Sequence, residues 1–303
     1  MPVPIILDCD PGIDDAVALL LALASPDEID LLAVTAVAGN VPLELTQANA
    51  RRVCDLARRP DVKVFAGADR PYGKSLVTAE HVHGTDGLGN IGLPPPVMPL
   101  QDGDAVDAMI DILKASEPPV TLCPVGPLTN VAAALDRAPE IAGRIDRIVL
   151  MGGAMMGGNV TPHAEFNIHV DPVAADIVFR CGRPVVMFGL DVTHKVRVTA
   201  DRHAAIRALG TPVATAVADM IGAGGGDVDD IVLHDPCVIA YLLAPDLFQG
   251  APRHVSVVTG PSAEEGRTVA APPSDAQQAN ATVMTDADAD GFFALLTVRL
   301  ARF

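Results

Sequence analysis

Short runs of β-branched and other apolar residues alternate along most of this chain with longer Ala- and Leu-rich stretches. The runs have the length and composition of buried strands, and the stretches between them suit helices. Strands that are apolar throughout and separated by helices are typical of a parallel sheet covered on both faces. We therefore predict an α/β fold with an open, mostly parallel, doubly wound sheet and helices on both faces. The predicted strands are residues 5–7, 30–37, 62–65, 120–123, 148–151 and 185–188, and the predicted helices are residues 14–24, 42–58, 104–115, 129–135, 172–181 and 235–243.

The last part of the chain departs from this alternation. Residues 253–259, 268–270 and 282–284 are candidate strands before a closing helix that begins at Asp288. Their pairing stays open, and extra antiparallel strands near the C-terminus are one arrangement. Residues 222–230 are rich in Gly and Asp and predict a mobile loop. Because no linker-like stretch divides the chain, we expect residues 1–303 to form a single domain.

Composition limits the partners that the chain can have. With 21 Lys+Arg against 38 Asp+Glu, the formal net charge is -17, which disfavours a nucleic-acid backbone as ligand. The five cysteines are scattered, with no C-x-x-C pair. We see no signal-peptide pattern at the N-terminus and no apolar stretch of membrane-spanning length. These features predict a cytoplasmic protein that binds a small neutral or cationic ligand, or a metal.

Four aspartates fall within eight residues near the N-terminus, where a predicted strand runs through a Pro-Gly turn into a helix: Asp8, Asp10, Asp14 and Asp15. Carboxylates this close together either hold a proton, with a raised pKa, or share a positive charge. A hard, oxygen-seeking cation such as Ca²⁺ or Mg²⁺ fits this pattern. Helix capping is the alternative for Asp14 or Asp15. It does not account for Asp8 and Asp10, which precede the turn.

Other notable residues follow further predicted strands. Asn40 comes after the second strand, Val125 after the fourth, and Met151 stands at the end of the fifth. The carboxyl ends of parallel strands lie on one rim of the sheet, and open α/β sheets bind their ligands there. We therefore expect these residues to converge on the aspartates.

A polar loop before the predicted helix at residues 172–181 carries Asn159, Glu165 and Asn167. Amides and carboxylates offer donors and acceptors that match vicinal hydroxyls. The alternative is that they form turns and Asx caps. On another predicted loop, His81 and His83 could form a lid, although most exposed loop histidines have no such role.

The segment Leu233-His234-Asp235-Pro236 opens a predicted helix. Taken alone, it predicts an Asp235 N-cap beside a surface histidine. In combination with Asp10 and Asp15, however, Asp235 could give a metal its third carboxylate. His234 would then stand beside the metal as a proton donor or acceptor.

Together these segments resemble the nucleoside hydrolases of the inosine-uridine preferring type, and the resemblance covers nearly the whole chain. Several motifs in the family's order make the match specific. They are Asp8-Cys9-Asp10-Pro11-Gly12-Ile13-Asp14-Asp15-Ala16, Ala38-Gly39-Asn40, Gly126-Pro127-Leu128-Thr129-Asn130, Met151-Gly152-Gly153, Ala164-Glu165-Phe166-Asn167, Leu233-His234-Asp235-Pro236, Ala279-Asn280-Ala281-Thr282-Val283 and Asp290-Gly291-Phe292-Phe293.

The resemblance implies a calcium-dependent N-ribohydrolase that hydrolyses the N-glycosidic bond of ribonucleosides to free base and ribose, in homodimers or homotetramers. The Ca²⁺ ligands would be Asp10, Asp15, Asp235 and the backbone carbonyl of Val125, and the ion would hold the ribose hydroxyls and the attacking water. Asp10 would be the general base for that water, and His234 would protonate or hydrogen-bond the leaving base. The residues that would contact the ribose are Asp14, Asn40, His83, Met151, Asn159, Glu165 and Asn167.

Two features differ from the family pattern. Val125 stands where relatives commonly have Thr, so a side-chain hydroxyl is lost while the carbonyl ligand remains. The chain also has no Trp, and residues 222–232 contain no aromatic residue. This argues against the purine-specific branch with its tryptophan sandwich and leaves the preferred base open.

Two other functions are compatible with parts of the sequence. Asp8-Cys9-Asp10-Pro11-Gly12 is similar to the D-x-D motif of haloacid-dehalogenase-like phosphatases, and the acids within residues 226–230 are similar to the distal metal-binding acids of those enzymes. A calcium-dependent nucleoside-binding protein without turnover is the other hypothesis.

Overall fold

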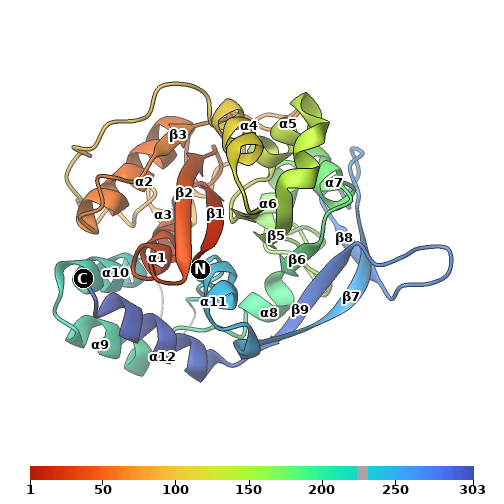
Figure 1. Ribbon diagram of the computed structural model, residues 1–303. Helices are drawn as coiled ribbons and strands as arrows, with labels where there is room; N and C mark the ends of the chain where they lie inside the picture. The colour runs from red at the N-terminus through yellow and green to blue at the C-terminus, as the bar shows by residue number, and fades with distance from the viewer. Residues whose placement is uncertain (224–230) are drawn as a thin grey trace.

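The computed structural model describes residues 1–223 and 231–303 and has the expected α/β architecture (Figure 1). Within these residues, nine strands form one sheet in the order β3-β2-β1-β4-β5-β6-β9-β7-β8. Neighbouring strands from β3 across to β9 are parallel, whereas β7 is antiparallel to both β9 and β8. The strands are β1 (Val3–Cys9), β2 (Ile29–Ala36), β3 (Val64–Ala66), β4 (Val120–Pro124), β5 (Ile145–Met151), β6 (Val185–Phe188), β7 (Phe248–Val257), β8 (Thr268–Ala271) and β9 (Ala281–Ala287).

Helices cover both faces of the sheet, as the alternating pattern predicts (Figure 1). The main helices are α1 (Ile13–Leu23), α2 (Leu43–Leu56), α4 (Ala105–Ala115), α5 (Thr129–Arg137), α7 (Pro172–Phe179), α9 (Ala200–Ala208), α10 (Pro212–Gly222), α11 (Pro236–Leu243) and α12 (Ala289–Leu300). Shorter helices are α3 (Glu80–His83), α6 (Phe166–Val170) and α8 (Leu190–Thr193), with 3-10 turns η1 (Pro139–Arg144) and η3 (Pro245–Leu247).

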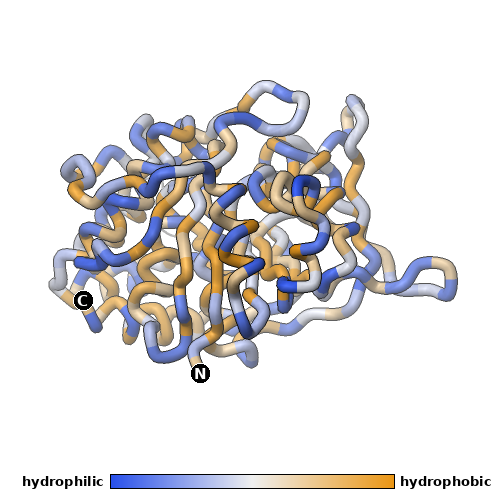
Figure 2. Tube along the Cα trace, turned by 45° about the horizontal axis from the view of Figure 1, so that its top comes forward, coloured by the Kyte–Doolittle hydropathy of each residue, from blue (hydrophilic) through white to orange (hydrophobic). Residues whose placement is uncertain are grey.

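Each face of the sheet has its own apolar core. In β1, Ile5 and Leu7 belong to the core shared with α1, α10 and α11, while Ile6 belongs to the core shared with α4, α5 and α7. This follows from the two-residue repeat of a strand, which sends neighbouring side chains to opposite faces. Figure 2 shows apolar residues along the central strands and polar residues in the outer loops.

The predicted strands and helices are confirmed within a few residues at their ends. The candidate strands near the C-terminus are confirmed as β7, β8 and β9, and β9 joins the parallel part of the sheet beside β6. The expectation that His81 and His83 lie on a loop is wrong, because both are in the short helix α3. Of the predicted loop at 222–230, residues 224–230 lie outside the described residues. No helix among those described is both long enough and apolar enough to cross a membrane.

The strand order places a topological switch point between β1 and β4. From β1 the chain proceeds to β2 and β3 on one side, and from β4 to β5 and β6 on the other. The loops after β1 and β4 therefore diverge and leave a crevice at the carboxyl ends of these strands. A Cβ atom at Gly39 or at Gly126 would overlap the carboxylate of Asp10. Only glycine at these two positions therefore allows the loops after β1, β2 and β4 to pack this closely.

Candidate active site

A cavity of about 480 Å³ opens at the carboxyl ends of the central strands. Apart from Asp10 and Asp15, which are buried, all the site residues predicted from the sequence line this cavity. They are Asp14, Asn40, His83, Val125, Met151, Asn159, Glu165, Asn167, His234 and Asp235. The expectation that segments distant in sequence converge at this rim is therefore confirmed. Lining residues that the sequence analysis did not propose include Ile13, Phe166, His194, Ile221 and Ile231.

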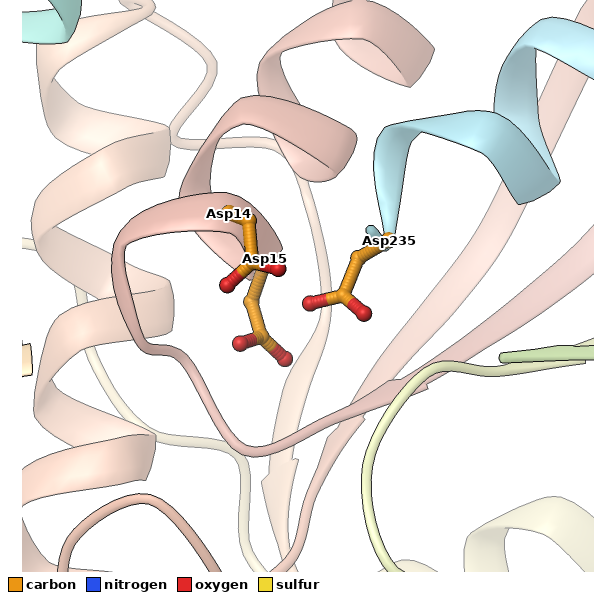
Figure 3. Close-up of side chains that lie close together, drawn as sticks. All are labelled: Asp14, Asp15 and Asp235. Carbon is orange, nitrogen blue, oxygen red and sulfur yellow. The ribbon is translucent and has the colours of Figure 1, made fainter. Parts of the chain in front are cut away.

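Three aspartates point toward one another beside the cavity (Figure 3). Asp14 and Asp15 come from the first turn of α1 and Asp235 from the start of α11, and one carboxylate oxygen from each lies within 4.8 Å of the others. Asp235 occupies the N-cap position but its side chain makes no capping bond. Asp15 does cap α1, since its Oδ2 accepts the Gly12 N–H at 3.0 Å, so the capping alternative holds for this residue.

Asp10 is held beneath the cavity with one oxygen unused. Its Oδ2 accepts the Asn40 N–H at 2.7 Å, whereas Oδ1 is buried and has no hydrogen-bond partner among the described residues. Burial and the neighbouring Asp15 raise the pKa of Asp10, and burial with nearby aspartates also raises the pKa of Asp235. Asp8 points to the same side of β1 as Ile6, toward the core shared with α4, α5 and α7. Thr35 and Asn130 donate to its Oδ1 there, and burial raises the pKa of Asp8 to about 7.

These observations fit a hard divalent cation. Buried carboxylates that repel one another, one of them with an orphaned oxygen, form an acidic centre that needs positive charge to stay ionised. The atoms that these aspartates offer to a metal are carboxylate oxygens, the ligand type that such cations prefer.

Two of the cavity amides, Asn40 and Asn167, use their side-chain N–H groups within the protein. Asn40 Nδ2 donates to Asp15 Oδ2 at 3.0 Å and to the Asp10 carbonyl at 3.1 Å. Asn167 Nδ2 donates to the Val125 carbonyl at 2.7 Å and to the Met151 carbonyl at 3.1 Å. Within the described residues, this leaves Oδ1 of each amide available to a ligand.

Glu165 and Asn159 hold the start of helix α6, and Asn167 lies in this helix and not on the predicted loop. Glu165 is the N-cap of α6 and accepts N–H groups of Gly153, Asn167 and Ile168 at 2.8 to 3.1 Å. Burial nevertheless raises the pKa of Glu165 to about 7. Asn159 Oδ1 accepts the Phe166 N–H at 2.9 Å, which leaves its amide N–H groups for the cavity. Glu165 is therefore a cap as the alternative predicted, while Asn159 holds the first residue of α6, and both residues also line the cavity.

Two of the cavity histidines have a fixed ring nitrogen. His83 Nδ1 accepts the Ile13 N–H at 3.1 Å, so its proton must reside on Nε2 when the ring is neutral. His234 Nδ1 lies 2.8 Å from Oγ1 of Thr193, and its ring meets the His194 ring edge-on with centroids 5.7 Å apart. Burial lowers the pKa of His234 to about 4, so the imidazole is neutral near pH 7. The sequence analysis missed Thr193 and His194, although both follow the predicted strand at 185–188 and therefore lie on the same rim.

Comparison with known proteins identifies the chain. The sequence model of the inosine-uridine preferring nucleoside hydrolases matches residues 5–294. The chain belongs to this family. It is a ribonucleoside hydrolase, a glycosidase that cleaves ribonucleosides to free base and ribose, and its family depends on a metal. The predicted resemblance, enzyme class and reaction are confirmed, and the family is a different one from that of the phosphatase hypothesis.

Relatives of this nucleoside hydrolase span its whole length. The pyrimidine-specific ribonucleoside hydrolase RihA of Salmonella gallinarum is 47% identical, over 99% of this chain and 99% of the relative. Among solved structures, a purine-preferring ribonucleoside hydrolase from Gardnerella vaginalis is 35% identical with a TM-score of 0.91, covering 98% of both chains. The plant nucleoside hydrolase PpNRh1 is 33% identical with a TM-score of 0.89, covering 99% of both chains.

Proposed function

We propose that this hydrolase acts on pyrimidine ribonucleosides with a bound Ca²⁺, with Asp10 as general base and His234 assisting the leaving base. The observation that carries this proposal is the meeting of Asp10, the three-aspartate cluster and His234 at a single crevice between β1 and β4. A base, an acidic metal centre and a hydrogen-bond donor within one cavity are the groups that hydrolysis of a glycosidic bond requires.

The residues that would hold Ca²⁺ are Asp10, Asp15, Asp235 and the carbonyl of Val125. The orphaned Oδ1 of Asp10 and the absence of a capping bond at Asp235 support this set. When bound, the ion supplies positive charge that keeps these carboxylates ionised and helps to orient the water and the ribose hydroxyls. Because the backbone carbonyl is the ligand at Val125, loss of the hydroxyl at this position leaves the set complete.

Asp10 would accept a proton from the attacking water. Its Oδ2 is fixed by the Asn40 N–H, so Oδ1, the oxygen that would also face the ion, offers its second lone pair for this task.

The ribose would be held by the polar atoms that the protein leaves unused. These are the carboxylate of Asp14 and the free amide atoms of Asn40, Asn159 and Asn167, with Glu165 capping the helix that carries Asn167. Met151 would pack against the sugar, and the Nε2 proton of His83 would face its hydroxyls.

An acidic site also favours the transition state of this reaction over the substrate. As the bond between the ribosyl carbon and the base breaks, the sugar acquires oxocarbenium character. Asp14 beside a neutral ribose gains little, whereas the same carboxylate beside a cationic ribosyl group is stabilising. Rate acceleration therefore comes from charge that develops only during the reaction.

His234 would donate a hydrogen bond to the departing base. Its lowered pKa makes the ring neutral near pH 7, so it acts as a hydrogen-bond donor to the negative charge that builds on the base. One preorganised donor to charge that develops in the transition state is worth roughly 10²- to 10³-fold in rate.

The preference for pyrimidines is supported by the relatives and by the cavity. The 47% identity to pyrimidine-specific RihA exceeds the 35% identity to the purine-preferring enzyme. The chain has no Trp with which to sandwich a purine, and among the described lining residues Phe166 carries the one phenyl ring.

The remaining expectations concern the chain as a whole. We propose that residues 1–303 act as a single domain, since one sheet runs through the described residues. We propose a reducing, cytoplasmic location, which agrees with five cysteines that are all free. Assembly as a homodimer or homotetramer stays a prediction, and light scattering on the purified protein tests it.

A reducing-sugar assay on uridine, cytidine, inosine, adenosine and guanosine tests the function directly. We expect release of ribose, with kcat/KM for uridine and cytidine at least about tenfold above the purine nucleosides, which corresponds to about 1.4 kcal/mol of discrimination. Equal or higher values for inosine would refute the base preference while leaving the hydrolase activity intact.

A further inference from the structure

Thr193, the last residue of α8, contacts the ring of His234. Its Oγ1 lies 2.8 Å from Nδ1 of a histidine that is 41 residues further along the chain. Thr193 is completely buried, whereas His234 lines the cavity. One ring nitrogen is therefore engaged inside the protein, and Nε2 is the nitrogen left for a ligand.

The direction of this hydrogen bond follows from the needs of the threonine hydroxyl. If Nδ1 carried the ring proton and donated to Oγ1, the buried hydroxyl hydrogen would need a different acceptor. Within residues 1–223 and 231–303, Thr193 Oγ1 has no second hydrogen-bond partner. A buried hydroxyl without an acceptor is costly, so the arrangement that satisfies every atom has Thr193 donating to Nδ1.

We propose that Thr193 is a positioning residue that donates to Nδ1 of His234 and so keeps the ring proton on Nε2, facing the leaving base. The inference rests on the proposed role of His234. When the C1′–N bond breaks, its electron pair moves onto the base, and the Nε2–H stabilises that charge by a hydrogen bond. The histidine keeps its proton, and the base anion takes its own from solvent.

The same contact orients the ring. A hydrogen bond at Nδ1 and the edge-on contact with His194 hold the imidazole from two sides. A ring held in one tautomer and one orientation has its donor in place before the bond breaks, which is how preorganised donors contribute to catalysis.

Removal of the hydroxyl with little change of shape provides the test. We expect Thr193→Val to lower kcat on uridine by about tenfold or more and to change KM by less than about threefold. On p-nitrophenyl riboside, whose leaving group needs little help, the loss should be under about twofold. Thr193→Ser, which keeps the hydroxyl, should restore most of the activity on uridine. Equal losses on the two substrates, or a Ser variant as impaired as Val, would overturn the proposal.

Nitrogen-15 NMR of the imidazole gives a readout that a merely structural role would not move. In the wild-type holoenzyme, His234 should show a protonated Nε2 and an unprotonated Nδ1 that accepts a hydrogen bond. A wild-type ring with its proton on Nδ1 would overturn the proposal even if Thr193→Val did not fold. In a folded Thr193→Val variant, verified by its melting temperature and calcium affinity, the Nδ1 resonance should shift.

His234→Ala separates this inference from the function on which it rests. We expect this variant to lose activity on uridine selectively, and Thr193→Val should then add less than about twofold in the same background. If His234→Ala impairs both substrates equally, the leaving-group role itself is wrong. If His234→Ala is selective for uridine while Thr193→Val is not, only the role of Thr193 is overturned.

Discussion

Asn40 holds Asp15 through its side chain: Nδ2 lies 3.0 Å from Asp15 Oδ2. The backbone N–H of Asn40 fixes Asp10 at the same time, with a 2.7 Å bond to Oδ2. Two acids from different elements are thus kept side by side by a residue that follows β2. The resemblance to nucleoside hydrolases predicted Asn40 as a ribose contact, and the structure gives it the additional task of ordering the acidic centre.

Asn40→Ala should therefore weaken calcium binding. The backbone bond to Asp10 survives the change, but Asp15 loses a donor that holds it in place. Loss of a supporting hydrogen bond around a metal ligand typically costs about 10- to 100-fold in affinity. Isothermal titration of the metal-free protein with Ca²⁺ measures this effect.

Asn49→Ala is the matched control. Asn49 is another buried amide near the Pro-Gly turn between β1 and α1. Its Nδ2 donates to the backbone carbonyls of Pro11 and Asp86 and not to a carboxylate of the acidic centre. We expect this variant to lower the free energy of unfolding by about 1–3 kcal/mol and to leave the calcium affinity within about twofold. An equal loss of calcium affinity in both variants would mean that a general loss of stability, and not the lost hydrogen bond to Asp15, explains the result for Asn40→Ala.

Chelation should inactivate the enzyme reversibly and destabilise it. Without a cation, the carboxylates whose pKa values are raised by burial and mutual repulsion are held together at a cost. Calcium at 100 times its dissociation constant would stabilise the fold by about 2.7 kcal/mol. We expect EGTA to abolish ribose release and lower the melting temperature, and added Ca²⁺ to restore both. Full activity after exhaustive chelation would remove the metal from the scheme.

The strand periodicity and the rule about carboxyl ends predicted the position of four site residues, because both depend on local sequence. Asp10, Asn40, Val125 and Met151 were predicted at the ends of their strands, and all four lie at or beneath the cavity. What could not be predicted is which atoms remain free. That Asn167 Nδ2 is engaged by the Val125 carbonyl depends on contacts between segments 42 residues apart.

Two of the helices that were missed, α8 and α9, have weak local signals. Helix α9 buries Ile206 alone, so it shows no apolar stripe, and α8 spans four residues, which is too short for periodicity. Helix α10 had a usable signal, since Thr211 caps it and Pro212 occupies the first turn. Thr193 and His194 lie at the end of α8 and were overlooked because this helix is too short to recognise, although the strand before it, β6, was predicted.

Glu165 should give the metal-free protein part of its pH dependence of stability. Its pKa is raised from 4.5 to about 7 in the folded protein, so between these values the folded state keeps a proton that the unfolded chain has released. Stability should fall by about 3 kcal/mol as pH rises through this window and level off on either side. Urea unfolding of the wild type and of Glu165→Gln from pH 4 to 8 tests this. The variant should lack this component, and parallel pH profiles would contradict the prediction.

Asp14 and Asp15 are neighbours in the same cluster but should respond differently to removal of their charge. Asp15 accepts N–H groups from Asp10, Gly12 and Asn40, whereas within residues 1–223 and 231–303 the Asp14 carboxylate accepts one hydrogen bond, a long contact of 3.4 Å from the His234 N–H. We expect Asp15→Asn to weaken calcium binding by about 100-fold or more, because a ligand and the acceptor for three donors are altered together. Asp14→Asn should lower kcat/KM for uridine by about 10- to 100-fold and leave calcium affinity nearly unchanged, since a charged hydrogen bond is worth about 1.5–3 kcal/mol and the Asp14 carboxylate also faces the charge that develops on the ribosyl group. Calcium titration and steady-state kinetics on both variants separate the two roles. A comparable loss of calcium affinity in Asp14→Asn would instead make Asp14 a metal ligand, as its place in the three-aspartate cluster also allows.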